Sequence, residues 1–122
     1  GTAMGIAAKA VAAMTREFGS RPSDIRAALG PCIGLCCFEV GPEVPEAMRN
    51  ALGADAEGCI EPRGEKYHVD LKGINRLWLA RAGLTEIDTC PDCTKCRPDR
   101  FWSHRAVGNH RGSQAAIIMR KE

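Results

Sequence analysis

The sequence predicts a fold of the α/β (α+β) class. A helical stripe opens the chain, an apolar stretch of strand length follows it, and a loop marked by glycine and proline comes directly after that stretch. Helical stripes that alternate with short apolar runs predict helices packed on strands. Loops that follow such strands are where proteins of this class place their functional sites.

The first helix is predicted over residues 4–18. Five apolar residues recur at intervals of three and four positions, so they share one helical face. Gly19 can end the helix because glycine adopts the left-handed conformation of a C-cap. Pro22 and Ser23 then turn the chain into a predicted strand, Ile25–Leu29. The apolar face consists of Met4, Ala7, Val11, Met14 and Phe18.

A shorter helix is predicted over Pro45–Leu52, with Gly53 at its end. The polar stretch of residues 55–64 contains glycine and proline, which favour a loop. One short strand is predicted inside it, near Cys59 and Ile60.

A strand at residues 67–69 leads into a third helix. Asp70 is a good N-cap residue, because its carboxylate can accept a hydrogen bond from a free N–H group of the first turn. Arg81 suits the negative end of the helix dipole, and Gly83 follows as the stop. The predicted buried stripe consists of Leu71, Ile74, Leu77 and Trp78.

Three further strands are predicted downstream, at Leu84–Ile87, Phe101–Arg105 and Ala115–Met119. No internal repeat, low-complexity tract or linker divides the chain. At 122 residues, one domain over residues 1–122 is therefore the expected organisation.

Composition limits the possible partners. The 17 basic and 15 acidic residues are interspersed, and the formal net charge of +2 is too small to indicate nucleic-acid binding. No apolar run reaches the length of a membrane span. Seven cysteines, an odd number that includes the adjacent pair Cys36 and Cys37, fit a disulfide scaffold poorly. Reduced thiols in a cytoplasmic protein are therefore expected.

Five motifs occur in a characteristic order along the chain. Together they resemble the laccase-domain family, whose members were once labelled polyphenol oxidases and are now regarded as purine nucleoside phosphorylases with adenosine deaminase activity. No single motif would suffice. The motifs are Gly1-Thr2 with Gly5-Ile6, the segment Gly30–Gly41, Asp70-Leu71 with Asn75 and Gly83, Cys93-Thr94-Lys95-Cys96, and Phe101–Arg105 with the closing segment Gly112–Ile117.

The resemblance implies layered, mixed β-sheets covered by helices, and it places this chain in the C-terminal half of a larger single domain. In the family, a His-Ala-Gly-Trp-Arg segment directly precedes the motif that begins at Gly1. Its His, with a His and a Cys further upstream, forms the catalytic zinc or copper site. We therefore expect no catalytic residue and no bound metal in this chain. The implied partners are a purine nucleoside, phosphate and the N-terminal half of the same protein.

Four residues are candidates for substrate binding. On a strand, Ser103 and Arg105 would share one face, where a hydroxyl and a guanidinium suit an anion such as phosphate. A structural salt bridge is the equal alternative for Arg105. Arg111 is a candidate because Ser113 stands where the family usually has an arginine. The fourth candidate is Cys32, which lies in one loop with Cys36 and Cys37. All three cysteines are expected to be packing residues in a loop near the pocket, and Cys32 is the one expected to line it.

Cys90, Cys93 and Cys96 suggest a second, different interpretation. Thiolates at this spacing can bind zinc, with His104 or His110 as a fourth ligand, so a small non-enzymatic zinc module is the alternative function. A single knuckle without a partner knuckle weakens that interpretation, and the family motif accounts for Cys93 and Cys96 without a metal. His68 is expected to be structural or on the surface. Trp78 and Trp102 are expected in the core or in a pocket wall.

Overall fold

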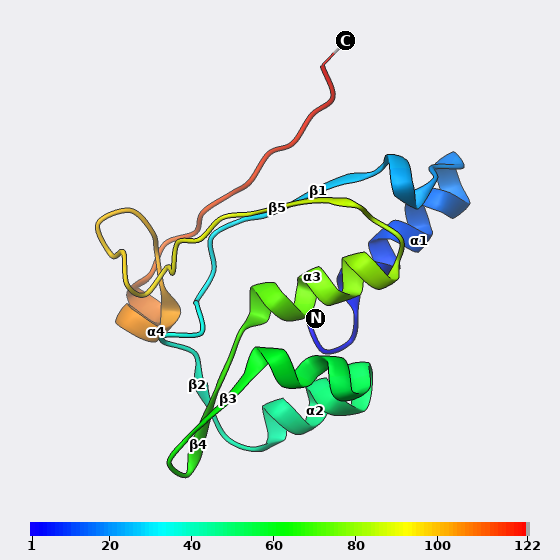
Figure 1. Ribbon diagram of the computed structural model, residues 1–122. Helices are drawn as coiled ribbons and strands as arrows, with labels where there is room; N and C mark the ends of the chain where they lie inside the picture. The colour runs from blue at the N-terminus through cyan, green and yellow to red at the C-terminus, as the bar shows by residue number, and fades with distance from the viewer. Residues whose placement is uncertain (122) are drawn as a thin grey trace.

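Within residues 1–121, which the computed structural model describes, two small sheets lie among four α-helices (Figure 1). Strands β1 (Arg26–Leu29) and β5 (Glu86–Thr89) pair in parallel. An antiparallel sheet has the order β2-β4-β3, with β2 at Glu39–Val40, β3 at Ile60–Arg63 and β4 at Lys66–Val69. The α-helices are α1 (Ile6–Phe18), α2 (Glu43–Leu52), α3 (Leu71–Arg81) and α4 (His104–Val107). The predicted α+β class is confirmed.

Helix α3 forms for the reasons the sequence indicates. Asp70 lies at its N-cap, and the Asp70 Oδ1 accepts a hydrogen bond from the Gly73 N–H at 3.0 Å. Ile74 is fully buried, and Leu71, Leu77 and Trp78 pack around the same core. That core lies between α2, α3 and the antiparallel sheet and consists of Val40, Met48, Leu52, Ala56, Cys59, Val69 and Ile74.

Helix α1 begins at Ile6, two residues later than predicted, and ends at Phe18 as predicted, where Gly19 caps it with a φ of 66°. Its apolar face is mostly not buried, since Val11 is its one buried residue. Val11 packs with Leu79 and Leu84 in a second, smaller cluster. Phe18 remains 81% exposed, and Met4 is also exposed. The periodicity therefore predicted the helix correctly but not the burial of its face.

The strand predictions were less accurate downstream of α3. Strand β5 begins at Glu86, two residues later than predicted, because Gly83 and the residues after it complete the turn out of α3. Phe101–Arg105 is not a strand, since helix α4 begins within it. Ala115–Met119 is not a strand either. No described segment pairs with it, and a strand needs a neighbour for its backbone hydrogen bonds.

The remaining connections are short 3₁₀ turns at Pro22–Asp24, Gly53–Cys59 and Gly108–His110. The second of these occupies much of the predicted loop 55–64, and β3 follows it where a short strand was expected. Among the described helices, none combines the length and the apolar character that crossing a bilayer requires.

Candidate functional site

Two loops leave the same end of the parallel sheet. The first cysteine loop (residues 30–38) follows β1, and the second cysteine loop (residues 90–103) follows β5. Because β1 and β5 are parallel, both loops begin at one edge, which is where open α/β sheets place ligand sites. Backbone hydrogen bonds continue the pairing beyond the strands. The Cys90 N–H donates to the Leu29 carbonyl at 2.8 Å, and the Thr94 N–H donates to the Cys32 carbonyl at 3.1 Å.

Four thiols converge between these loops. The Sγ atoms of Cys36, Cys37, Cys93 and Cys96 all lie within 4.8 Å of one another. The Cys96 Sγ is 3.5 Å from the Cys36 Sγ and 3.4 Å from the Cys37 Sγ. Cys93 is buried, Cys37 is half-buried, and Cys36 and Cys96 are exposed. We call this group the four-cysteine cluster.

The thiols of the cluster differ in acidity. Burial raises the pKa of Cys93, but backbone N–H groups of Gly34, Cys96 and Lys95 point at its sulfur, and the balance lowers the pKa to about 6. The Gly34 N–H donates to the Cys93 Sγ at 3.2 Å. In contrast, burial raises the pKa of Cys36. The surrounding backbone N–H groups therefore stabilise the thiolate form of Cys93.

The cluster changes the cysteine predictions. Of the alternative trio Cys90, Cys93 and Cys96, the cluster includes Cys93 and Cys96 but not Cys90. Cys36 and Cys37 were expected to pack, yet the first is exposed and the second half-buried, because the loop turns their side chains toward Cys96. Two features of the cluster are visible in the sequence, the adjacent pair Cys36-Cys37 and the Cys-x-x-Cys pair Cys93 and Cys96. Nothing in the sequence indicates that the two pairs lie close together in space.

Cys32 lies beside the cluster, where it forms an isolated parallel bridge with Cys93. Its thiol is half-buried and donates to the Ile33 carbonyl at 3.4 Å. Burial raises its pKa. Its predicted place in a pocket wall stays a prediction.

Ser103 and Arg105 do not share a strand face, since no strand is present there. Ser103 is the buried N-cap of α4, and its Oγ accepts a hydrogen bond from the Ala106 N–H at 3.3 Å. Arg105 extends from the first turn of α4. Its guanidinium donates to the Glu39 carbonyl at 2.8 Å and lies 5.2 Å from the centroid of the Phe38 ring. Within residues 1–121, no ion pair includes Arg105.

Arg111 lies next to the same short helix. Its Nε is 3.4 Å from the Nδ1 of His104, the first residue of α4. The structure thus brings Ser103, Arg105 and Arg111 to α4. It places Cys32 separately, in the neighbouring loop.

His68 anchors the first cysteine loop. Its side chain is buried, and its Nδ1 lies 2.5 Å from the Leu35 carbonyl oxygen. A carbonyl can only accept, so Nδ1 carries the proton. The expectation of a structural rather than a metal-binding His68 fits this contact.

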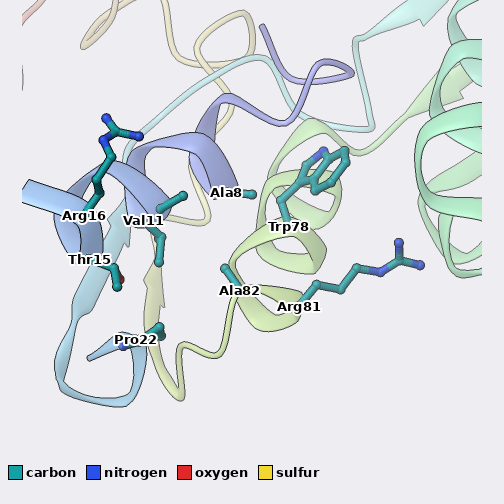
Figure 2. A pocket seen from close by; sticks show the side chains of 9 residues that line it. Ala8, Val11, Thr15, Arg16, Pro22, Trp78, Arg81 and Ala82 are labelled. Carbon is teal, nitrogen blue, oxygen red and sulfur yellow. The ribbon is translucent and has the colours of Figure 1, made fainter. Parts of the chain in front are cut away.

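A shallow hollow lies elsewhere, between α1 and α3 (Figure 2). Its walls are mainly Val11, alanines and Trp78, and Arg81 extends away from it toward the carbonyl of Leu52 and the carboxylate of Asp55. Trp78 donates its indole N–H to the Thr2 carbonyl at 2.9 Å. None of the predicted site residues lines this hollow, so we do not treat it as the site.

A family model described as "Multi-copper polyphenol oxidoreductase laccase" matches residues 1–121. The chain belongs to this family. A protein named "Purine nucleoside phosphorylase YlmD", from Geobacillus stearothermophilus, is 37% identical over 125 residues, which cover 100% of this chain and 46% of that protein. One named "Adenosine deaminase RL5", from an unknown prokaryotic organism, is 36% identical over 124 residues, 99% of this chain and 47% of that protein.

Solved structures agree with the family assignment. The crystal structure of the Bacillus licheniformis hypothetical protein YfiH matches with a TM-score of 0.83 and 38% identity, over 87% of this chain and 41% of that one. The predicted resemblance is therefore confirmed. The chain spans about half the length of these laccase-family relatives.

The described residues do not form the metal site that the family resemblance implies. That site needs two histidines and a cysteine, whereas the one group of three or more potential ligands found between residues 1 and 121 is the four-cysteine cluster. His68, His104 and His110 are not part of any such group. The chemistry of four thiolates is that of a closed, structural site rather than one that activates water.

Proposed function

We propose that this laccase-family chain is the C-terminal part of a cytoplasmic purine nucleoside phosphorylase, active on adenosine and inosine, that also deaminates adenosine. The observation that carries the proposal is the match of residues 1–121 to the family, together with relatives named purine nucleoside phosphorylase and adenosine deaminase. The match to the relative named purine nucleoside phosphorylase YlmD covers 100% of the chain.

The proposed reaction is phosphorolysis. A phosphate oxygen attacks C1′ of the ribose, the bond from C1′ to the purine nitrogen breaks, and its electron pair leaves with the base, which takes up a proton. The products are a free purine and ribose 1-phosphate. In the deamination, water adds at C6 of adenosine and ammonia leaves, which gives inosine.

We assign this chain the anion-binding side of the site. Arg105 uses one guanidinium nitrogen for the Glu39 carbonyl, which leaves other N–H donors for a phosphate oxygen. Arg111 would add a second positive charge near α4, and Ser103 a hydroxyl whose hydrogen is still available to donate. Phe101 and Trp102 would form an aromatic wall for a planar base, with Cys32 in the neighbouring loop.

The zinc or copper ion of the family would supply activated water for deamination, and its ligands are expected upstream of residue 1. No step is assigned here to that ion, because the described residues do not form its site.

The test is a product assay on the protein encoded by the complete reading frame. Inosine with phosphate should give hypoxanthine and ribose 1-phosphate in equal amounts, and adenosine without phosphate should give inosine and ammonia. A preparation that is folded and free of host phosphorylase, yet forms neither pair of products, would contradict the proposal. That result would favour the alternative of a non-enzymatic zinc module, which the four converging thiols support.

A further inference from the structure

We propose that Cys36, Cys37, Cys93 and Cys96 form a structural zinc site that joins the two cysteine loops at the edge of the β1–β5 sheet. The site is separate from the proposed catalytic metal and does not depend on the proposed enzymatic function. It also replaces the expectation that this chain binds no metal.

The distances suit one tetrahedral ion. Zinc bonds to thiolate sulfur are about 2.3 Å long, so four sulfurs around one zinc lie about 3.8 Å from one another. All four Sγ atoms of the cluster lie within 4.8 Å of one another, and two of the pairs are at 3.5 Å and 3.4 Å. Small side-chain rotations would complete the tetrahedron. With four sulfur ligands no position remains open, which is typical of structural zinc.

The backbone around Cys93 supports a thiolate ligand. Cys93 and Cys96 have the Cys-x-x-Cys spacing, and the N–H groups of Lys95 and Cys96 point back at the Cys93 sulfur. Gly34 donates a third N–H from the opposite loop. A Cβ atom at Gly34 would lie 3.2 Å from the Cys93 Cβ and 3.3 Å from the Cys36 Sγ, so a glycine is what lets the loops approach. Such outer contacts orient metal ligands and balance their charge.

Hydrogen bonds of the protein itself also hold the two loops in position. Hydrogen bonds link Cys90 to Leu29 and Thr94 to Cys32, and His68 holds the Leu35 carbonyl. The ligands therefore come from two segments whose relative position the sheet determines. On binding, each thiol that is still protonated would release its proton to solvent, so the zinc and four thiolates carry a net charge of −2.

A disulfide is the competing use of these thiols. The sulfur pairs at 3.4 Å and 3.5 Å are well beyond the bond length of about 2.05 Å. Cys96 lies within 3.5 Å of both Cys36 and Cys37 and could bond to only one of them. A single disulfide would thus leave two thiols of the cluster without a role, whereas one zinc ion uses all four.

The experiment uses the 122-residue protein, purified with a reductant and without a chelator. Metal content is measured by elemental analysis and native mass spectrometry, and affinity by competition with a chromophoric chelator. We expect about one zinc per chain, and cobalt(II) in its place should give the intense sulfur-to-metal charge-transfer bands of a four-thiolate site.

Replacing exposed cysteines tests zinc binding without disturbing the fold. Cys36→Ser and Cys96→Ser remove ligands whose side chains are exposed, so the apolar core keeps its packing. Because loss of an outer contact already weakens metal binding by about 10- to 100-fold, loss of a ligand should lower zinc affinity by at least about 100-fold. Cys90→Ser is the matched control, since Cys90 lies in the same loop but outside the cluster. It should bind zinc as the parent does.

Three results would contradict the proposed zinc site. The reduced parent protein could retain no zinc and show seven free thiols, it could hold iron in place of zinc, or it could form a disulfide within the cluster under reducing conditions. Equal losses of zinc affinity in Cys90→Ser and Cys96→Ser would also overturn it. If the chain alone proves insoluble, the same comparison is made in the protein from the complete reading frame, where Cys96→Ser should remove one zinc per chain and Cys90→Ser none.

Discussion

The two apolar clusters of this chain differ in how completely they are covered. The first, between α2, α3 and the antiparallel sheet, contains Leu52, Val69 and Ile74, which the chain buries almost fully. The second, between α1, α3 and the β1–β5 sheet, buries only Val11, Leu79 and Leu84. Phe18, at the end of α1, is exposed, and Ile117 is 93% exposed. Ile117 belongs to the C-terminal segment, which runs as an extended trace away from the helices and sheets (Figure 1).

This difference indicates which part of the chain folds on its own contacts. Exposed apolar surface on a helix face and an unpaired extended segment are both typical of surfaces that another segment covers. The first cluster is then a self-contained core, and we propose that the second is a face of a larger domain. The thiols of the four-cysteine cluster converge from two loops at the end of the less covered sheet.

The largest expected effect concerns activity. The 122-residue chain alone should form no ribose 1-phosphate from inosine or adenosine, because the family resemblance implies a histidine and cysteine set at the reacting centre, and no such group occurs among the described residues. Product formation is measured by chromatography, with the protein from the complete reading frame as the positive control. Robust turnover by the chain alone would mean that the less covered face needs no partner for catalysis.

The next effect compares the two clusters directly. Ile74→Ala should lower the free energy of unfolding by about 2–5 kcal/mol, since Ile74 is fully buried and its removal leaves a cavity. Phe18→Ala should change it by less than about 0.5 kcal/mol, since Phe18 is exposed. Urea unfolding followed by circular dichroism measures both. Similar losses for the two variants would mean that α1 is as well packed as α3.

A smaller effect is expected on self-association. The uncovered face should make the chain associate at high concentration, and Phe18→Asp with Ile117→Asp should weaken that association by roughly tenfold or more, because burial of one such side chain is worth about 1.5–3 kcal/mol. Light scattering after size-exclusion chromatography gives the mass at each concentration. The matched control is Lys9→Asp, which changes charge on α1 without removing apolar surface. A parent protein that stays monomeric, with a high melting temperature, would contradict the comparison.

Local signals in the sequence predicted the fold best where the structure depends on local contacts. Helix α3 was predicted with its cap at Asp70 and its buried Ile74, because a cap and a helical stripe are properties of neighbouring residues. Phe101–Arg105 was predicted wrongly as a strand, whereas Ser103 begins a helix as its N-cap. Ala115–Met119 has strand composition but no pairing partner in the described chain.

The four-cysteine cluster could not be predicted in full for a related reason. Cys37 and Cys96 are 59 residues apart, and only the parallel pairing of β1 with β5 brings their loops together. The Cys-x-x-Cys spacing indicated one half of the cluster. The adjacent cysteines of the other half have no spacing that indicates metal, so they were interpreted as packing residues.

We propose that this chain supplies the phosphate-binding side of a nucleoside phosphorylase, and the decisive variant is Arg105→Ala in the protein from the complete reading frame. Loss of a charge-assisted contact worth about 1.5–3 kcal/mol should weaken apparent phosphate affinity by roughly 10- to 150-fold. Deamination, which uses no phosphate, should change far less. Arg100→Ala is the matched control, because Arg100 also lies over an aromatic ring, Phe101 at 5.5 Å, without a proposed role.

The measurement is the ratio of phosphorolysis to deamination at varied phosphate, with the melting temperature of each variant. We predict that Arg105→Ala lowers this ratio at low phosphate, that saturating phosphate partly restores it, and that Arg100→Ala leaves it unchanged. Equal losses of both activities in Arg105→Ala, together with a large drop in melting temperature, would contradict the claim. They would make the contacts of Arg105 with the Glu39 carbonyl and the Phe38 ring its whole role.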